Sequence, residues 1–248
     1  RAPQEVYVIL GPTGGGKTLL GIQLCTAAAS YTHCSTWNVI VTYESRKEVI
    51  YERALCQMAF LTPQRLAEIV QTGQFSPYPT ETDRLLFPHC DYNDIPLEET
   101  RYKLAVEEFN ENCRVFDFSG QCINNKVFGG GGIDEIAEAL MHLQSTTSKK
   151  IGQVVIDWAG AAIQRTCARS GQDPLKYYYS MLDSYIQTTY EKIALEFDCS
   201  VFVTHQLAGA VNSRSPSRPA HHSEAAWCKS FANFAAFAFA LGTTDPKK

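Results

Sequence analysis

Five short runs of the chain are mainly apolar and do not alternate with polar residues. They are rich in β-branched and aromatic side chains, a pattern typical of strands that are buried on both faces of a parallel sheet. The predicted strands are Val6–Leu10, Val39–Tyr43, Arg114–Phe118, Val154–Ile156 and Ser200–Thr204. A sheet of this kind requires helices on both of its faces.

Segments with helical spacing of apolar residues lie between these strands. The predicted helices are Lys17–Ala29, Glu48–Phe60, Asp134–Leu143 and Tyr179–Phe197. Because strands and helices alternate along the chain, we expect an α/β fold with a mostly parallel central sheet flanked by helices.

The stretch Thr62–Asn112 is longer than one crossover connection needs. It contains two helical pieces, Leu66–Val70 and Glu98–Phe109, around a proline-rich middle. We therefore expect one domain over residues 1–248 with an insertion at about 62–112. The last apolar run, Phe231–Leu241, is predicted to form another core strand.

Composition and charge exclude several classes of protein. The 248 residues are 45% hydrophobic and 19% charged, which is typical of a globular domain. The formal net charge of −4 argues against a protein that coats nucleic acid or anionic membranes by bulk charge. The run Phe231–Leu241 is too short to span a bilayer, and no secretory leader is visible. Nine cysteines without a CxxC pair are typical of free thiols in a reducing cytosol, so we expect a cytoplasmic location.

The first predicted strand leads directly into a glycine-rich loop that is followed by a predicted helix. The loop matches the pattern GxxxxGK[ST], in which backbone N–H groups and a helix N-terminus surround a phosphate. The predicted nucleotide-binding residues are Gly11, Pro12, Thr13, Gly14, Gly15, Gly16, Lys17 and Thr18. Lys17 would reach the β- and γ-phosphates of ATP, and the Thr18 hydroxyl would ligate Mg²⁺.

Two carboxylates follow predicted strands. Asp157 ends the apolar segment Gln153–Asp157 at the edge of the sheet where ligands bind, so we expect it to hold Mg²⁺ through a water molecule. Glu44 follows Val39–Tyr43 and would act as the general base if that strand lies beside the Asp157 strand. The alternative for Glu44 is a helix cap formed with Ser45.

A polar pair, His205–Gln206, follows the strand Ser200–Thr204. A polar side chain at this edge could contact the γ-phosphate and respond to its loss. The alternative is the start of a solvated loop.

The order of these motifs resembles that of the RecA-like P-loop ATPases. Within that family, the chain resembles the motor domains of hexameric replicative helicases of the DnaB and RepA type, with KaiC-like proteins as relatives. The residues that carry the resemblance are Gly11–Thr18, Val41–Ser45, Val154–Asp157 and Val203–Leu207. The resemblance implies a RecA-like fold, ATP and Mg²⁺ as ligands, Glu44 as the catalytic glutamate and Gln206 as the sensor. It also implies a homo-oligomeric ring that acts in DNA replication, with other replication or recombination proteins as partners.

Similar motors bind DNA with two loops that follow the Asp157 and Gln206 strands. We expect these loops to be Ala159–Tyr178 and Leu207–Ser223, and we expect single-stranded DNA to contact Arg165, Arg169, Arg214 and Arg218. Solvated loops that happen to carry basic residues are the alternative.

A neighbouring subunit would complete the nucleotide site. No cation except Lys17 is evident within the same chain's site, and the region in which such motors place basic residues toward a neighbour's nucleotide contains Lys229. Lys229 is therefore predicted to act in trans, with a surface lysine as the alternative.

Two functions remain open. One is a ring-forming, DNA-stimulated ATPase or helicase, and the other is a KaiC-like switch or assembly ATPase with protein partners.

Overall fold

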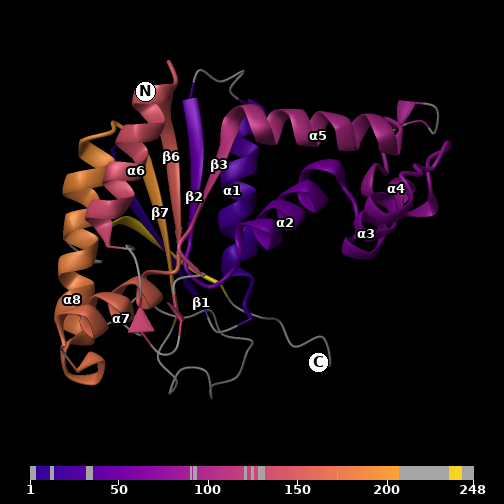
Figure 1. Ribbon diagram of the computed structural model, residues 1–248. Coiled ribbons are helices and arrows are strands. Elements are labelled where there is room, and N and C mark those ends of the chain that lie inside the picture. The colour runs from indigo at the N-terminus through magenta and orange to yellow at the C-terminus, as the bar shows by residue number, and fades with distance from the viewer. Residues whose placement is uncertain are drawn as a thin grey trace.

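A six-stranded, all-parallel sheet forms the centre of the protein, as seen in a computed structural model (Figure 1). The structure describes residues 4–11, 14–31, 36–89, 91, 94–119, 122–123, 126–127, 132–171, 173–206 and 235–241. The strands lie in the order β3-β2-β6-β7-β1-β8. Their bounds are β1 Val6–Gly11, β2 Thr36–Thr42, β3 Cys113–Asp117, β6 Lys150–Asp157, β7 Ser200–Gln206 and β8 Ala235–Ala240. The fold is α/β, as the alternation of patterns predicted.

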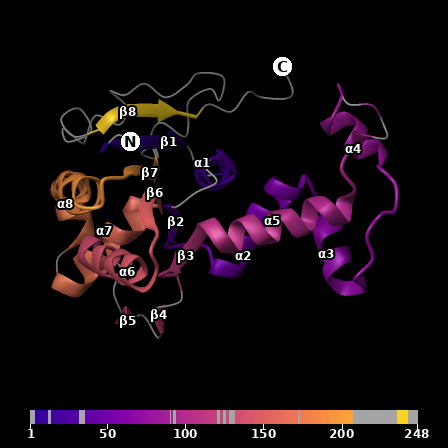
Figure 2. The same cartoon turned by 90° about the horizontal axis from the view of Figure 1, so that it is seen from above.

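Helices cover both faces of the sheet (Figures 1 and 2). On one face, α1 (Lys17–Tyr31) and α2 (Lys47–Ala59) pack over β2, β3 and β6 together with part of α5 (Glu98–Asn112). On the other face lie α6 (Ile133–Thr146), α7 (Ala159–Ser170) and α8 (Pro174–Thr189), and α8 continues into a π-helical turn, Tyr190–Leu195. A small hairpin of β4 (Cys122–Ile123) and β5 (Lys126–Val127) stands apart from the sheet.

The strands are buried on both faces because their side chains pack alternately against the two helical layers. Val154 and Ile156 belong to the core beneath α6, α7 and α8, whereas Val155 packs with Ile22 of α1 and Ile50 of α2. This two-sided burial explains why the strand sequences do not alternate between apolar and polar residues.

The segment between α2 and α5 projects away from the sheet as an arm (Figure 2). It contains α3 (Pro63–Thr72) and a short helix that the sequence did not predict, α4 (Glu81–Leu86). A buried ion pair between Arg101 and Asp83, with N and O atoms 2.5 Å apart, ties α4 to α5. The carboxyl-terminal part of α5 returns to the sheet and contacts β2 and β3, so this part of the predicted insertion is the crossover into β3. The division of residues 1–248 into one domain with an insertion stays a prediction.

The last strand lies at the edge of the sheet rather than in the core. Among the described residues β8 pairs only with β1, and Phe237 and Phe239 are 63% and 47% exposed. Both rings stack beside Tyr7, with ring centroids 6.3 and 6.4 Å away. The prediction of a core strand was therefore wrong in its placement, because an apolar run does not reveal that one side of the strand lacks a neighbour.

The described residues include no helix with the length and apolar character needed to cross a membrane. Cys25 and Cys199 are buried with free thiols.

Candidate active site

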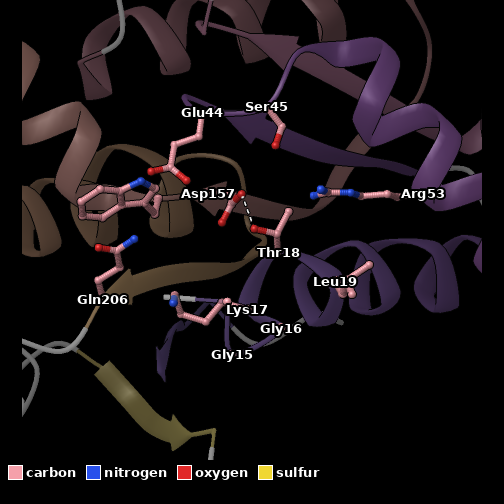
Figure 3. A pocket seen from close by; sticks show the side chains of 12 residues that line it. Gly15, Gly16, Lys17, Thr18, Leu19, Glu44, Ser45, Arg53, Asp157 and Gln206 are labelled. Atoms are coloured by element: carbon pink, nitrogen blue, oxygen red, sulfur yellow. Dashed lines mark hydrogen bonds between the residues drawn. The ribbon is translucent and has the colours of Figure 1, made fainter. Parts of the chain in front are cut away.

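The carboxyl ends of four strands meet at one edge of the sheet. Thr42 of β2 lies opposite Asp157 of β6, and Leu10 and Gly11 of β1 lie opposite His205 and Gln206 of β7. The side chains that follow these strand ends share one cavity of about 360 Å³ (Figure 3). Its lining residues are Gly14, Gly15, Gly16, Lys17, Thr18, Leu19, Glu44, Ser45, Arg53, Asp157, Trp158 and Gln206.

The glycine-rich loop joins β1 to α1 directly, because β1 ends at Gly11 and α1 begins at Lys17. Gly14 and Gly16 have φ angles of +72° and +82°, a left-handed backbone conformation that residues other than glycine rarely adopt. Apart from each glycine's own chain neighbours, no described atom lies within 4 Å of the position that a Cβ would take at either residue, so space remains around this part of the backbone for a phosphate. Pro12 and Thr13 lie outside the described residues.

Lys17 is the first residue of α1 and is 7% exposed. Its Nζ donates a hydrogen bond to the carbonyl oxygen of Gly11 at 3.0 Å. Burial lowers the pKa of Lys17, while the negative charges of Asp157 and Glu44 act in the opposite direction. The Lys17 ammonium group therefore lies beside the start of the glycine-rich loop and within the influence of both carboxylates.

The Asp157 carboxylate, 3% exposed, is held between two threonine hydroxyls. Thr18 donates to Oδ2 at 2.8 Å, and Thr204 of β7 donates to Oδ1 at 2.7 Å. A hydroxyl and a carboxylate are the oxygen ligands that Mg²⁺ prefers. The oxygens of Thr18 and Asp157 thus have the chemistry that would hold a magnesium ion.

Glu44 follows β2 and extends into the cavity toward Asp157 (Figure 3). The condition for its predicted role is met, because β2 pairs with β6 and the amide of Tyr43 donates to the carbonyl oxygen of Asp157 at 2.9 Å. The capping alternative is not observed, since α2 is preceded by Arg46, which makes no side-chain cap hydrogen bond. The structure thus brings Lys17, Thr18, Glu44, Asp157 and Gln206 together.

Arg53 was not predicted to belong to this site. It lies on α2, and its guanidinium extends toward Thr18 and Asp157 (Figure 3). The expectation that Lys17 is the sole cation of the chain's own site is therefore wrong. Only the packing of α2 against α1 brings Arg53 to the cavity, and no motif in the sequence marks it.

His205 lies behind the cavity on β7 and is buried. Burial, assisted by the positive charge of Lys17, lowers the pKa of His205 to about 4. The imidazole is therefore neutral at physiological pH, and the polar residue that reaches the cavity from β7 is Gln206.

The first predicted DNA-binding loop is instead two helices. Within this range α7 covers Ala159–Ser170 and α8 begins at Pro174. In α7 the buried residues recur at helical spacing, namely Ala159, Ala162, Ile163 and Cys167. Arg165 and Arg169 lie on α7, but the structure does not describe their side chains. The predicted site residues Arg214, Arg218 and Lys229 lie outside the described residues.

Comparisons with known proteins show the fold alone. No protein-family profile matches the sequence, and no curated protein matches it. One solved structure, described as an ATPase domain, superposes with a TM-score of 0.62 at 14% identity, over 96% of this chain and 69% of that chain. A second, a DnaB-like replicative helicase described with its interactions with primase, superposes with a TM-score of 0.64 at 15% identity, over 96% of this chain and 48% of that chain. The chain therefore shares the fold of these two structures, as the resemblance to RecA-like ATPases predicted. It spans about half the length of the second of these proteins.

Proposed function

We propose that this chain, which shares its fold with the ATPase domains of DnaB-like replicative helicases, binds ATP with Mg²⁺ and hydrolyses it. The observation that carries the proposal is the convergence of Lys17, Thr18, Glu44 and Asp157 on one cavity at the mouth of a glycine-rich loop. Each of these side chains has the chemistry that phosphoryl transfer to water requires.

Binding begins at the loop and the first turn of α1. Backbone N–H groups from Gly14 to Thr18 and the positive end of the helix dipole attract the phosphates. Lys17 exchanges its hydrogen bond with the Gly11 carbonyl for contacts with the β- and γ-phosphates. Mg²⁺ bound at Thr18 and Asp157 would neutralise charge on the phosphate oxygens.

Hydrolysis uses Glu44 as the general base. Its carboxylate accepts a proton from a water molecule while the water oxygen forms a bond to the γ-phosphorus and the bond to the ADP oxygen breaks. Arg53 adds positive charge on the α2 side of the cavity, and Gln206 contacts the γ-phosphate or the water from the β7 side.

We further propose that residues 1–248 are one motor domain that assembles into a ring and acts on single-stranded DNA. In such a ring a neighbouring subunit would add positive charge at the γ-phosphate, with Lys229 as the candidate. Arg165, Arg169, Arg214 and Arg218 are the candidates for phosphate contacts along the strand. The competing function is a KaiC-like ATPase that responds to protein partners.

Steady-state ATPase rates with and without Mg²⁺ test the proposed hydrolysis of ATP, and rates with and without single-stranded DNA test the proposed action on DNA. We expect hydrolysis that requires Mg²⁺ and that increases when single-stranded DNA is added. Hydrolysis that DNA does not change would favour the KaiC-like function, and a protein without Mg²⁺-dependent hydrolysis would contradict the ATPase itself.

Salt titration of DNA binding tests the arginines directly. Replacing Arg165, Arg169, Arg214 and Arg218 with glutamine should reduce the slope of log K against log salt by about 0.7 for each lost phosphate contact with a single strand. Four exposed basic residues that are not among these candidates, Arg46, Lys47, Lys103 and Lys150, form a matched control whose replacement should leave most of the slope unchanged.

A further inference from the structure

The indole of Trp158 belongs to the cavity, but none of the functions considered so far uses it. Trp158 follows Asp157 directly, where β6 ends and α7 is about to begin, and it lines the cavity together with Glu44 and Gln206. Its Nε1–H group is buried and makes no hydrogen bond with the described residues. A buried donor without an acceptor is unfavourable, so this N–H is expected to gain a partner when the cavity fills.

The rest of the indole is fixed in place. A Cβ at Gly160 would lie 1.6 Å from Cζ3 and 2.3 Å from Cε3 of Trp158, so only a glycine at position 160 leaves room for the ring. The imidazole of His205 lies near the indole, with ring centroids 6.4 Å apart. The indole N–H is therefore a donor on a preorganised scaffold.

The other described tryptophan shows what a satisfied indole looks like in this protein. Nε1 of Trp37 donates to Oγ1 of Thr147 at 2.8 Å, far from the cavity. The missing acceptor is thus a property of the Trp158 site, and the two residues offer an internal comparison.

The hydrogen-bond requirements of the attacking water identify the acceptor. The water has two O–H donors and two lone pairs, and one lone pair must face the γ-phosphorus. Glu44 accepts one O–H, and the Gln206 amide oxygen can accept the other. The remaining lone pair needs a donor. Among the donors that line the cavity, Lys17 and Thr18 are directed to phosphate and metal, and Arg53 extends toward Thr18 and Asp157. The Gln206 amide already meets the water through its oxygen, so the indole N–H is the donor that we assign to this lone pair.

We propose that the Nε1–H of Trp158 donates a hydrogen bond to the water that attacks the γ-phosphate, and so orients that water together with Glu44. This inference rests on the proposed ATPase function. The proton of the water passes to Glu44, and Trp158 keeps its own proton throughout. Trp158 is then a catalytic residue that contributes orientation rather than charge.

The indole N–H signals of protein labelled with ¹⁵N-tryptophan test the contact itself. The sequence contains three tryptophans, and the Trp158 signal is identified as the one that is lost in the Trp158→Phe variant. On addition of Mg²⁺ and the non-hydrolysable analogue AMP-PNP, we expect the Trp158 signal to move downfield. The Trp37 signal should stay in place, because that N–H already has its partner.

Kinetics of Trp158→Phe test the catalytic contribution. The variant keeps an aromatic ring and loses the donor, so kcat should fall about three- to tenfold, the value of one neutral hydrogen bond, while the Kd for Mg²⁺–AMP-PNP stays within about twofold. Trp158→His, which restores a ring N–H, should recover part of kcat.

The outcomes separate this inference from the proposed function. AMP-PNP binding with an unmoved Trp158 signal, or an unchanged kcat in Trp158→Phe, would overturn the role of Trp158 and leave the ATPase intact. A protein that binds no AMP-PNP would remove the ATPase and this inference together. If the Phe variant folds poorly, Trp37→Phe and Trp227→Phe assign the other two signals and identify the Trp158 signal by elimination.

Discussion

Thr204 on β7 donates a 2.7 Å hydrogen bond to Oδ1 of Asp157 on the neighbouring strand β6. The bond is buried and joins two strands at the edge of the sheet where the cavity opens. It holds the carboxylate so that Oδ2 faces Thr18. Thr204 therefore orients the proposed metal ligand without lining the cavity itself.

Replacement of Thr204 by valine removes this hydroxyl and keeps the shape of the side chain. Because the bond has a charged acceptor, the free energy of unfolding should fall by about 1.5 to 3 kcal/mol. The Mg²⁺ concentration that gives half-maximal ATPase activity should also rise. Urea denaturation and a Mg²⁺ titration measure the two effects, and Thr204→Ser, which keeps the hydroxyl, should restore most of both. If valine leaves the Mg²⁺ requirement unchanged, the bond is structural only.

Glu44→Gln tests the general base. The amide keeps the shape of the side chain but cannot take the proton, so kcat should fall by about 10²-fold or more while the affinity for Mg²⁺–ATP is retained. Single-turnover hydrolysis and equilibrium binding measure these separately. Glu48→Gln is a matched control, because Glu48 is exposed at the first turn of α2 and does not line the cavity. Loss of affinity along with rate would indicate that Glu44 holds the metal instead.

Arg53→Gln tests the cation that α2 brings to the cavity. Loss of a charge-assisted hydrogen bond to phosphate should weaken Mg²⁺–ATP binding by about tenfold or more. Arg46→Gln, just before α2, serves as the control because it removes the same charge outside the cavity. Equal affinities of the two variants would exclude Arg53 from phosphate binding.

The lowered pKa of His205 predicts that the protein loses stability in acid. Its pKa is lowered from 6.5 to about 4 in the folded protein, so between these values the unfolded chain binds the extra proton and a fall in pH favours unfolding. Above pH 6.5 both states are neutral and the residue has no effect. By pH 4.5 this difference in pKa should lower the free energy of unfolding by about 2 to 3 kcal/mol.

The comparison is made by urea denaturation at pH 7 and pH 4.5. Wild-type protein should lose about 2 to 3 kcal/mol more than His205→Gln over this interval. The control is His142→Gln, which removes an exposed histidine of α6. Identical pH dependence in wild type and His205→Gln would show that the buried imidazole does not titrate as described.

Local sequence patterns were sufficient to predict the strands from β1 to β7 that form the sheet and the residues at the centre of the candidate site, but not the edge position of β8. Burial on both faces makes a parallel strand visible as a continuous apolar run, and the glycine-rich loop carries its own signature between β1 and α1. Asp157 and Glu44 could be placed because they follow such strands. The predicted role of Glu44 also required that β2 pair with β6. This pairing is a tertiary contact, so it is known from the structure and not from the local sequence.

The features that were missed depend on contacts between distant segments. Arg53 reaches the cavity only because α2 packs beside α1, and Thr204 reaches Asp157 only because β7 pairs with β6. Residues 159–178 were interpreted as a loop from the family resemblance, although Ala159, Ile163 and Cys167 have the spacing of a buried helical face. In that segment the local pattern was the better guide.

Equilibrium binding of Mg²⁺–ATP to wild-type protein and to Lys17→Ala tests the central claim most directly. Wild-type protein should bind the nucleotide and hydrolyse it. Lys17→Ala should lose both properties, because the phosphates lose their buried positive charge. Lys103→Ala is the control, since Lys103 is an exposed lysine that pairs with Glu99 on α5, and it should behave as wild type. Binding and hydrolysis by Lys17→Ala at the wild-type level would contradict the assignment of this cavity as the ATPase site.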